Sequence, residues 1–197
     1  MLNQLLALNK SVFLVLTSLW SINIIRPFIF LFADAPIFIL PLFLVWFWIF
    51  YTTKKNQSWK EKLLLIFYAT VVAIILNMII QKFVHMDRPE VFAKSVGHLL
   101  LNHVPDASFP SDHASVGIAF ATALFLFDYA SIGYIVLPLI IIMLFSRVIG
   151  GIHWPLDIFG WTIIGIVSAF LIKSQKNNKL VEKLNKFILK LTRYIKL

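Results

Sequence analysis

A histidine and an aspartate four positions apart, His153 and Asp157, have the types and spacing needed for nucleophilic catalysis. Pro155 lies between them and suits the first turn of a helix, so both side chains can lie on one face where that helix begins. Asp157 can then accept a hydrogen bond from one ring nitrogen of His153, which leaves the other nitrogen to attack phosphorus. We therefore predict that His153 is a nucleophile and that Asp157 orients it.

A second histidine, His113, opens a different apolar segment of the chain. From that position we expect it to protonate the oxygen that leaves phosphorus, which contributes about 10²- to 10⁴-fold to a rate. The predicted reaction passes through a phosphohistidine on His153. Water then hydrolyses this intermediate, and His113 acts as the base that activates the water.

Two arginines and a serine provide groups that bind a phosphate. The guanidinium groups of Arg88 and Arg147 form planar forks that match two phosphate oxygens, and no dense group of carboxylates is close in sequence to neutralise them. Ser111 follows Pro110 and precedes a long apolar run, so we expect it to cap a helix whose first backbone N–H groups point at the phosphate. The site is therefore predicted to bind an anion.

Two other interpretations of these polar residues stay open. Arginines and histidines often mark the ends of membrane spans without any further role. The two histidines could also hold a metal ion together with Asp112 and Asp157, but arginines repel a cation and already supply positive charge to a phosphate. The absence of cysteine excludes thiolate chemistry and Cys-based metal sites. We expect a site with no metal and no cofactor.

The elements that position these residues are predicted to be transmembrane helices. Of the 197 residues, 60% are hydrophobic and 14% are charged, and the mean hydropathy is +0.87, whereas soluble domains are about 25% charged. Apolar runs occur at 11–33, 35–51, 63–80, 114–127, 132–145 and 155–172. We predict an all-α, polytopic bundle of five or six spanning helices, with one membrane domain over residues 1–175 and a basic cytoplasmic tail over 176–197.

The first apolar run is interrupted by Arg26 and Pro27. An arginine at the centre of a span costs about 2.5–3.5 kcal/mol on insertion scales. The N-terminal segment can therefore be interfacial or re-entrant, and the bundle would then have five spans.

Lysines at two places indicate the orientation of the bundle. Four of them lie in the loop 52–62 and others follow the last span, so the positive-inside rule places both regions in the cytoplasm. Two loops on the same side of a membrane must be separated by an even number of spans. Four apolar runs separate these two regions, so the number of runs agrees with the charge distribution. The segment 81–110 and the loop 147–155 then face outward, toward the periplasm or the cell exterior, and these segments carry the polar site.

The C-terminal tail holds much of the net charge of +9, since eight of the eighteen basic residues lie within 173–196. Basic charge directly after a span favours the membrane surface, and we expect no nucleic-acid partner. Apolar residues recur at helical spacing from Leu180 to Ile195. We predict an amphipathic helix on an anionic lipid surface, with a regulatory or partner-binding tail as the alternative. The sequence leaves any oligomeric partner open.

The sequence resembles the type 2 phosphatidic acid phosphatase superfamily, the membrane lipid phosphatases related to vanadium haloperoxidases, over about residues 35–172. The motifs that carry the resemblance are Arg88-Pro89, PSDH at 110–113 and SRVIGGIHWPLD at 146–157. The last string matches in full the family's third motif of Ser-Arg, five residues, His, three residues and Asp. The resemblance implies a metal-independent hydrolase in which phosphate is bound by Arg88, Ser111 and Arg147, and in which His113 is the general acid, His153 the nucleophile and Asp157 its partner.

Two positions depart from the family's motifs. The family has a lysine seven residues before the arginine of its first motif, but Gln81 stands there, and Lys82 follows about 100° further around a helix. Lys82 is therefore a weak candidate for phosphate binding, and a lysine that snorkels to the interface is the alternative. The second motif has Asp112 where the family has glycine, which makes Asp112 a weak candidate for contact with a second phosphate or for a hydrogen bond within its loop.

The string DASFPSDH at 106–113 resembles the branch of the family that dephosphorylates undecaprenyl diphosphate, the carrier lipid of bacterial cell-wall synthesis. The resemblance implies hydrolysis to undecaprenyl phosphate and phosphate at the outer face of the bacterial inner membrane, in peptidoglycan biogenesis. Glu90 is less typical of that branch, so phosphatases for phosphatidylglycerophosphate, phosphatidate or the lipid A phosphate are alternatives. A non-catalytic lipid-binding or transport bundle is the alternative from another class, and a haloperoxidase is a third. Ordinary exposed histidines are expected at His85, His98 and His103.

Overall fold

The computed structural model describes residues 2–83, 89 and 112–194, and all structural statements concern this part of the chain. No strand occurs among these residues. The elements in chain order are α1 (Leu2–Ser18), the short 3-10 helix η1 (Leu19–Ser21), α2 (Arg26–Thr53), α3 (Gln57–Gln81), α5 (Asp112–Leu126), α6 (Ala130–Ile149), α7 (Pro155–Gln175) and α8 (Lys179–Tyr194).

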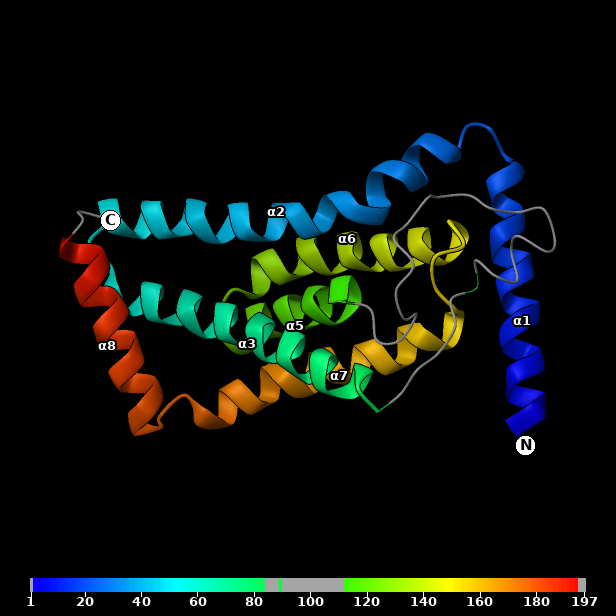
Figure 1. The fold of residues 1–197 in the computed structure, drawn as a ribbon. Helices are drawn as coiled ribbons and strands as arrows, with labels where there is room; N and C mark the ends of the chain where they lie inside the picture. The colour runs from blue at the N-terminus through cyan, green and yellow to red at the C-terminus, as the bar shows by residue number, and fades with distance from the viewer. Residues whose placement is uncertain (1, 84–88, 90–111, 195–197) are drawn as a thin grey trace.

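Five of these helices run side by side as a bundle (Figure 1). By length and composition, α2, α3, α6 and α7 can each cross a membrane, and α5 is a shorter apolar helix over His113–Leu126. The predicted all-α, polytopic bundle is thereby confirmed. Within the described residues it has four candidate spans and the shorter apolar helix α5, and α1 does not run along the bundle.

The helix α1 runs across one end of the bundle, and α8 runs across the opposite end (Figure 1). Phe13 of α1 is buried against Val148 and Trp154, which lie on either side of the α6–α7 loop. Asn9 and Lys10 lie in the middle of α1, where the interior of a membrane would penalise them. At the membrane interface, α1 keeps the contact of Phe13 with the bundle, and Asn9 and Lys10 stay out of the membrane interior.

The break between α1 and α2 differs from the one that hydropathy indicated. The sequence predicted a single apolar run over 11–33 with Arg26 and Pro27 inside it. In the structure the connection lies at 22–25, and α2 begins at Arg26 with Pro27 in its first turn, where a missing N–H removes no helical hydrogen bond. Nε of Arg26 donates a hydrogen bond of 2.8 Å to the Trp20 carbonyl, so this arginine lies at a helix end.

The short helix α5 forms the centre of the bundle and packs against α3, α6 and α7. Most of its residues from Ala114 to Leu124 are buried. A Cβ added to Gly165 of α7 would lie 2.7 Å from the Ser115 carbonyl oxygen, so the two helices approach each other closely at a small residue. On the α3 side, Asn77 donates a hydrogen bond to Ser115 Oγ. These contacts fix the helix whose first turn carries His113.

Candidate active site

The third sequence motif spans the last turn of α6, a short loop and the first turn of α7. The loop turns sharply at Gly151, whose φ of 76° is left-handed and favours glycine. The turn returns the chain so that α7 begins two residues after His153. As a result Arg147, His153 and Asp157 lie together at the end of the bundle, each with only 1% of its surface exposed.

Asp157 contacts both the Trp154 backbone and the His153 ring. Its Oδ2 accepts a hydrogen bond of 2.9 Å from the Trp154 backbone N–H, which stabilises the first turn of α7. The same oxygen lies 3.9 Å from His153 Nδ1, which is close enough for an electrostatic contact but too long for a hydrogen bond. Catalytic hydrogen bonds are often long before substrate binds and shorten in the reacting complex. The carboxylate is therefore held in place by the helix start and faces the ring.

The other ring nitrogen of His153 faces Arg147. Nη2 of Arg147 lies 3.3 Å from Nε2 of His153. A guanidinium only donates hydrogen bonds, so this contact is favourable when Nε2 carries the lone pair and Nδ1 carries the proton, toward Asp157. Trp161 packs edge-on against the imidazole with ring centroids 4.4 Å apart and restricts its rotation. This tautomer leaves the lone pair on Nε2, beside a cation suited to phosphate.

A carboxylate from α2 joins this group. Oδ1 of Asp34 accepts a hydrogen bond of 2.5 Å from Nη1 of Arg147 and lies 3.4 Å from Nε2 of His113. The same Nη1 also donates to the Ala33 carbonyl at 3.1 Å. About half of the Asp34 side chain is exposed, whereas Arg147 is buried. One oxygen of Asp34 therefore bridges the arginine and the second histidine of the predicted site.

Sequence analysis missed Asp34. It stands alone within the apolar string FLFADAPIF, and it fell between two predicted runs instead of inside a helix. The signal that could have found it is its charge, because an ionisable residue within a transmembrane segment usually has a function or a buried partner.

The α1 helix also supports the site, a role that the sequence did not indicate. Oδ1 of Asn9 accepts a hydrogen bond of 3.0 Å from the Leu156 backbone N–H, in the first turn of α7. Phe13 packs against Trp154 with ring centroids 4.9 Å apart. Both contacts hold α1 against the loop that carries His153 and the first turn of α7.

Of the four other predicted phosphate-binding residues, Lys82 is the one whose side chain lies within the described part of the structure. Arg88 and Ser111 lie outside the described residues, as do His85, His98 and His103. Asp112 begins α5, but its side chain is also outside the described part. Lys82 follows the end of α3 and is exposed. Its backbone N–H donates to the Ile79 carbonyl at 3.2 Å, but its side chain forms no hydrogen bond or ion pair with another described residue.

The sequence pattern of the PAP2 superfamily matches residues 62–180, which is more than half of the chain. The chain belongs to the PAP2 superfamily. The predicted family and the predicted enzyme class, a phosphatase, are thereby confirmed.

Curated relatives of this PAP2 protein carry related names. YbjG of Escherichia coli (strain K12), provisionally named an undecaprenyl-diphosphatase, is 32% identical over 77% of this chain and 75% of its own. BcrC of Bacillus subtilis (strain 168), named undecaprenyl-diphosphatase, is 33% identical over 66% of this chain and 64% of its own. BcrC of Bacillus licheniformis, named a bacitracin transport permease protein, is 30% identical over 76% of this chain and 71% of its own.

A solved structure shares the PAP2 fold. The crystal structure of Aquifex aeolicus LpxE superposes with a TM-score of 0.70 at 23% identity and covers 84% of this chain and 94% of the other. The PAP2 match starts at residue 62, so it contains Arg147, His153 and Asp157 but neither Asp34 nor α1. In this PAP2 phosphatase, the parts of the site that the sequence missed therefore come from the N-terminal segment.

Proposed function

We propose that this membrane phosphatase hydrolyses undecaprenyl diphosphate to undecaprenyl phosphate and inorganic phosphate, through a phosphohistidine on His153. The observation that carries the mechanism is the position of His153 between Arg147 at Nε2 and Asp157 at Nδ1. The names of YbjG and of the Bacillus subtilis BcrC, together with the string at 106–113, support the choice of substrate.

In the first step Nε2 of His153 attacks the terminal phosphorus, and the bond from phosphorus to the bridging oxygen breaks. Arg147 stabilises negative charge on the transferring phosphoryl group, and Asp157 stabilises the imidazolium that forms. His113 gives its proton to the bridging oxygen, so undecaprenyl phosphate leaves. His113, His153 and Asp157, which lie around Arg147 in the folded chain, each have a role in this step.

In the second step water attacks the phosphorus of phosphohistidine. His113, which lost its proton in the first step, accepts a proton from the water, and the bond from phosphorus to Nε2 breaks. Inorganic phosphate is released and His153 returns to its neutral form. Arginine and histidine side chains supply all the charge and proton transfer in this scheme, so it requires no metal.

Motif matches complete the proposed phosphate site. Arg88 and Ser111 are proposed as phosphate ligands, and Asp112 as a weaker contact to the second phosphate, on the strength of the sequence alone. Lys82, exposed beyond the end of α3, is proposed only as a weak phosphate contact.

The decisive experiment offers purified protein a panel of lipids in turn and measures phosphate release. We expect prenyl diphosphates to be hydrolysed faster than phosphatidylglycerophosphate, phosphatidate or lipid A, and we expect activity to persist in chelator. Substrate with a labelled terminal phosphate should label the protein in an acid-labile, base-stable bond, and His153→Ala should abolish both labelling and turnover. The substrate assignment is wrong if undecaprenyl and farnesyl diphosphate are the poorest substrates.

A non-catalytic lipid-binding or transport bundle is the second candidate, because one relative carries the name of a transport permease. Pure binding or transport requires neither a nucleophile nor its orienting carboxylate. His153→Ala therefore separates the two functions, since a transporter would keep its function at close to the wild-type rate.

We further propose that the active site faces outward from the bacterial inner membrane. The lysine-rich turn between α2 and α3 and the helix α8 lie at the same end of the bundle, opposite to α1 and the active site (Figure 1). Because the chain has no cysteine, Ser21→Cys and Lys55→Cys give single thiols near the two ends. In whole cells an impermeant maleimide should label Cys at 21 but not at 55, and the reverse pattern would contradict this orientation.

A further inference from the structure

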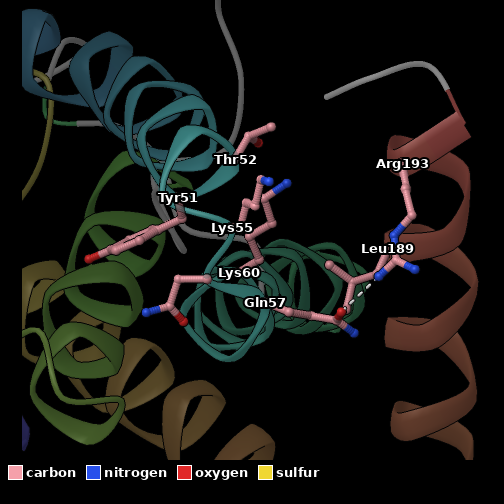
Figure 2. Close-up of a pocket in the computed structure, with 8 residues that line it drawn as sticks. Tyr51, Thr52, Lys55, Gln57, Lys60, Leu189 and Arg193 are labelled. Carbon is pink, nitrogen blue, oxygen red and sulfur yellow. Dashed lines mark hydrogen bonds between the residues drawn. The ribbon is translucent and has the colours of Figure 1, made fainter.

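A cavity of about 430 Å³ lies at the end of the bundle opposite to the active site, between the α2–α3 turn and α8. Figure 2 shows that its walls come from the end of α2, the start of α3 and the last turns of α8. Neither the PAP2 match nor the proposed reaction assigns a role to this cavity.

The cavity is strongly basic. Among the residues that the structure describes, Lys55, Lys60 and Arg193 line it, and no carboxylate does. Lys60 is buried, with 9% of its surface exposed, and its Nζ packs 4.8 Å from the centre of the Trp48 ring. Asp128, which does not line the cavity, pairs with Lys62 at 2.9 Å. Three like charges around one cavity repel one another, so an anion within it would stabilise all three.

The neutral side chains of the cavity also offer donors. Oδ1 of Asn56 accepts the Trp59 backbone N–H at 3.3 Å, and Oε1 of Gln57 accepts from Nη2 of Arg193 at 2.9 Å (Figure 2). Both amides thus use their oxygen in protein contacts, and their NH₂ groups can donate to a ligand. The cavity also lies at the N-terminus of the 25-residue helix α3, whose dipole favours an anion there.

An apolar groove of about 260 Å³ follows this cavity along the surface between α2 and α3. Its lining includes Trp48, Leu64 and Phe67 and is entirely apolar. Leu64 and Phe67 lie four and seven residues after Lys60, on the same face of α3, and Trp48 lies four residues before Thr52 on α2. Trp48 belongs to the groove and packs on Lys60 of the cavity, so the basic and apolar parts are continuous.

The helix α8 closes the cavity and lies where lipid headgroups would be. Leu189 is buried, and Asn185 Oδ1 accepts a hydrogen bond of 2.9 Å from the Tyr68 hydroxyl of α3. Leu180 and Phe187, on another face of α8, are 74% and 64% exposed. This division matches a helix that lies at the membrane surface, with one face on the bundle and apolar residues available to lipid.

We propose that the α2–α3 groove and α8 form a binding site for an anionic phospholipid, such as phosphatidylglycerol. The phosphate occupies the basic cavity, and an acyl chain follows the apolar groove. A soluble phosphate would satisfy the cations but would leave the groove empty, so the continuous apolar surface favours a lipid. The site is distant from His153 and does not depend on the proposed substrate.

The test measures ligand retention and thermal unfolding of the full chain in a zwitterionic detergent. Phosphatidylglycerol added to the micelles should be retained, as counted by native mass spectrometry, and should raise the unfolding temperature. Phosphatidylcholine, inorganic phosphate and glycerol 3-phosphate at matched concentrations should do neither. The double substitution Lys60→Gln and Arg193→Gln should weaken retention of phosphatidylglycerol by about tenfold or more, because each removes a charged hydrogen bond.

The matched control is Lys183→Gln with Lys190→Gln, which removes the same charge from two exposed lysines of α8 that do not line the cavity. This control should retain phosphatidylglycerol like the wild type. Equal loss in both double variants would show that general charge attraction holds the lipid and would overturn the site. An equal effect of inorganic phosphate or glycerol 3-phosphate would overturn the lipid assignment, and this comparison uses the wild-type protein, so it stands even if a variant fails to fold.

Discussion

Nη1 of Arg147 donates a hydrogen bond of 2.5 Å to Oδ1 of Asp34, although the two residues are 113 positions apart in the chain. Arg147 lies in the last turn of α6 and Asp34 in the third turn of α2, so the contact joins two candidate spans. It holds the guanidinium from one side, while His153 lies at its other terminal nitrogen. The orientation of the proposed phosphate ligand thus depends on a residue outside the PAP2 match.

Removal of this carboxylate should weaken catalysis. We expect Asp34→Ala to lower kcat/KM by about 10- to 100-fold, because a hydrogen bond to a charged group contributes about 1.5–3 kcal/mol. Asp34→Asn keeps an oxygen for Nη1 and should lose less. Steady-state kinetics of both variants provide the measurement. A lower KM with unchanged kcat in Asp34→Ala would instead show that the carboxylate competes with phosphate for Arg147.

The two contacts of Asp157 can be separated by substitution. Asp157→Asn keeps an oxygen for the Trp154 N–H, so its thermal stability should match the wild type, while kcat should fall by at least about 10²-fold because the amide cannot stabilise an imidazolium. Asp157→Ala should lose the same activity and also about 1 kcal/mol of stability with the helix cap. Equal kcat in Asp157→Asn and wild type would exclude the orienting role.

The proposed role of His113 as general acid predicts that its loss affects substrates differently according to their leaving group. His113→Gln should slow hydrolysis of phosphatidate, whose alkoxide needs a proton, by about 10²- to 10⁴-fold. Hydrolysis of p-nitrophenyl phosphate should decline much less, because its phenolate leaves without a proton. His153→Ala serves as the control and should abolish both reactions. Equal losses for the two substrates in His113→Gln would assign His113 to phosphate binding instead.

Close packing between α5 and α7 predicts a graded response to added methyl groups. Gly165→Ala places a Cβ 2.7 Å from the Ser115 carbonyl and Ile118 Cβ, atoms that cannot move without the helix, and should destabilise the protein by about 1–3 kcal/mol. Gly117→Ala meets only the side-chain ends of Ile140 and Met143, at 3.0–3.2 Å, and should cost less. Thermal unfolding in detergent gives the comparison. The packing argument is wrong if Gly117→Ala is the more damaging change.

Much of the fold, and the proximity of three candidate site residues, could be predicted from local sequence patterns. Arg147, His153 and Asp157 lie within eleven consecutive residues, so one turn at Gly151 is enough to bring them together. Apolar runs marked the spans of α3, α6 and α7 closely, because the membrane selects for composition over a length of about 20 residues. The interruption at Arg26-Pro27 was visible too, but hydropathy alone could not place the helix boundary beside it.

The sequence by itself determined the family, the all-α membrane bundle and the spacing of Arg147, His153 and Asp157, because these depend on residues that are close together in the chain. Only the tertiary structure decided that Asp34 binds Arg147, that α1 lies across the active-site end, and that α8 closes a basic cavity. Each of these joins helices that are remote in sequence. Helical periodicity shows which face of a helix is apolar, but the neighbour of that face is set by packing of the whole bundle.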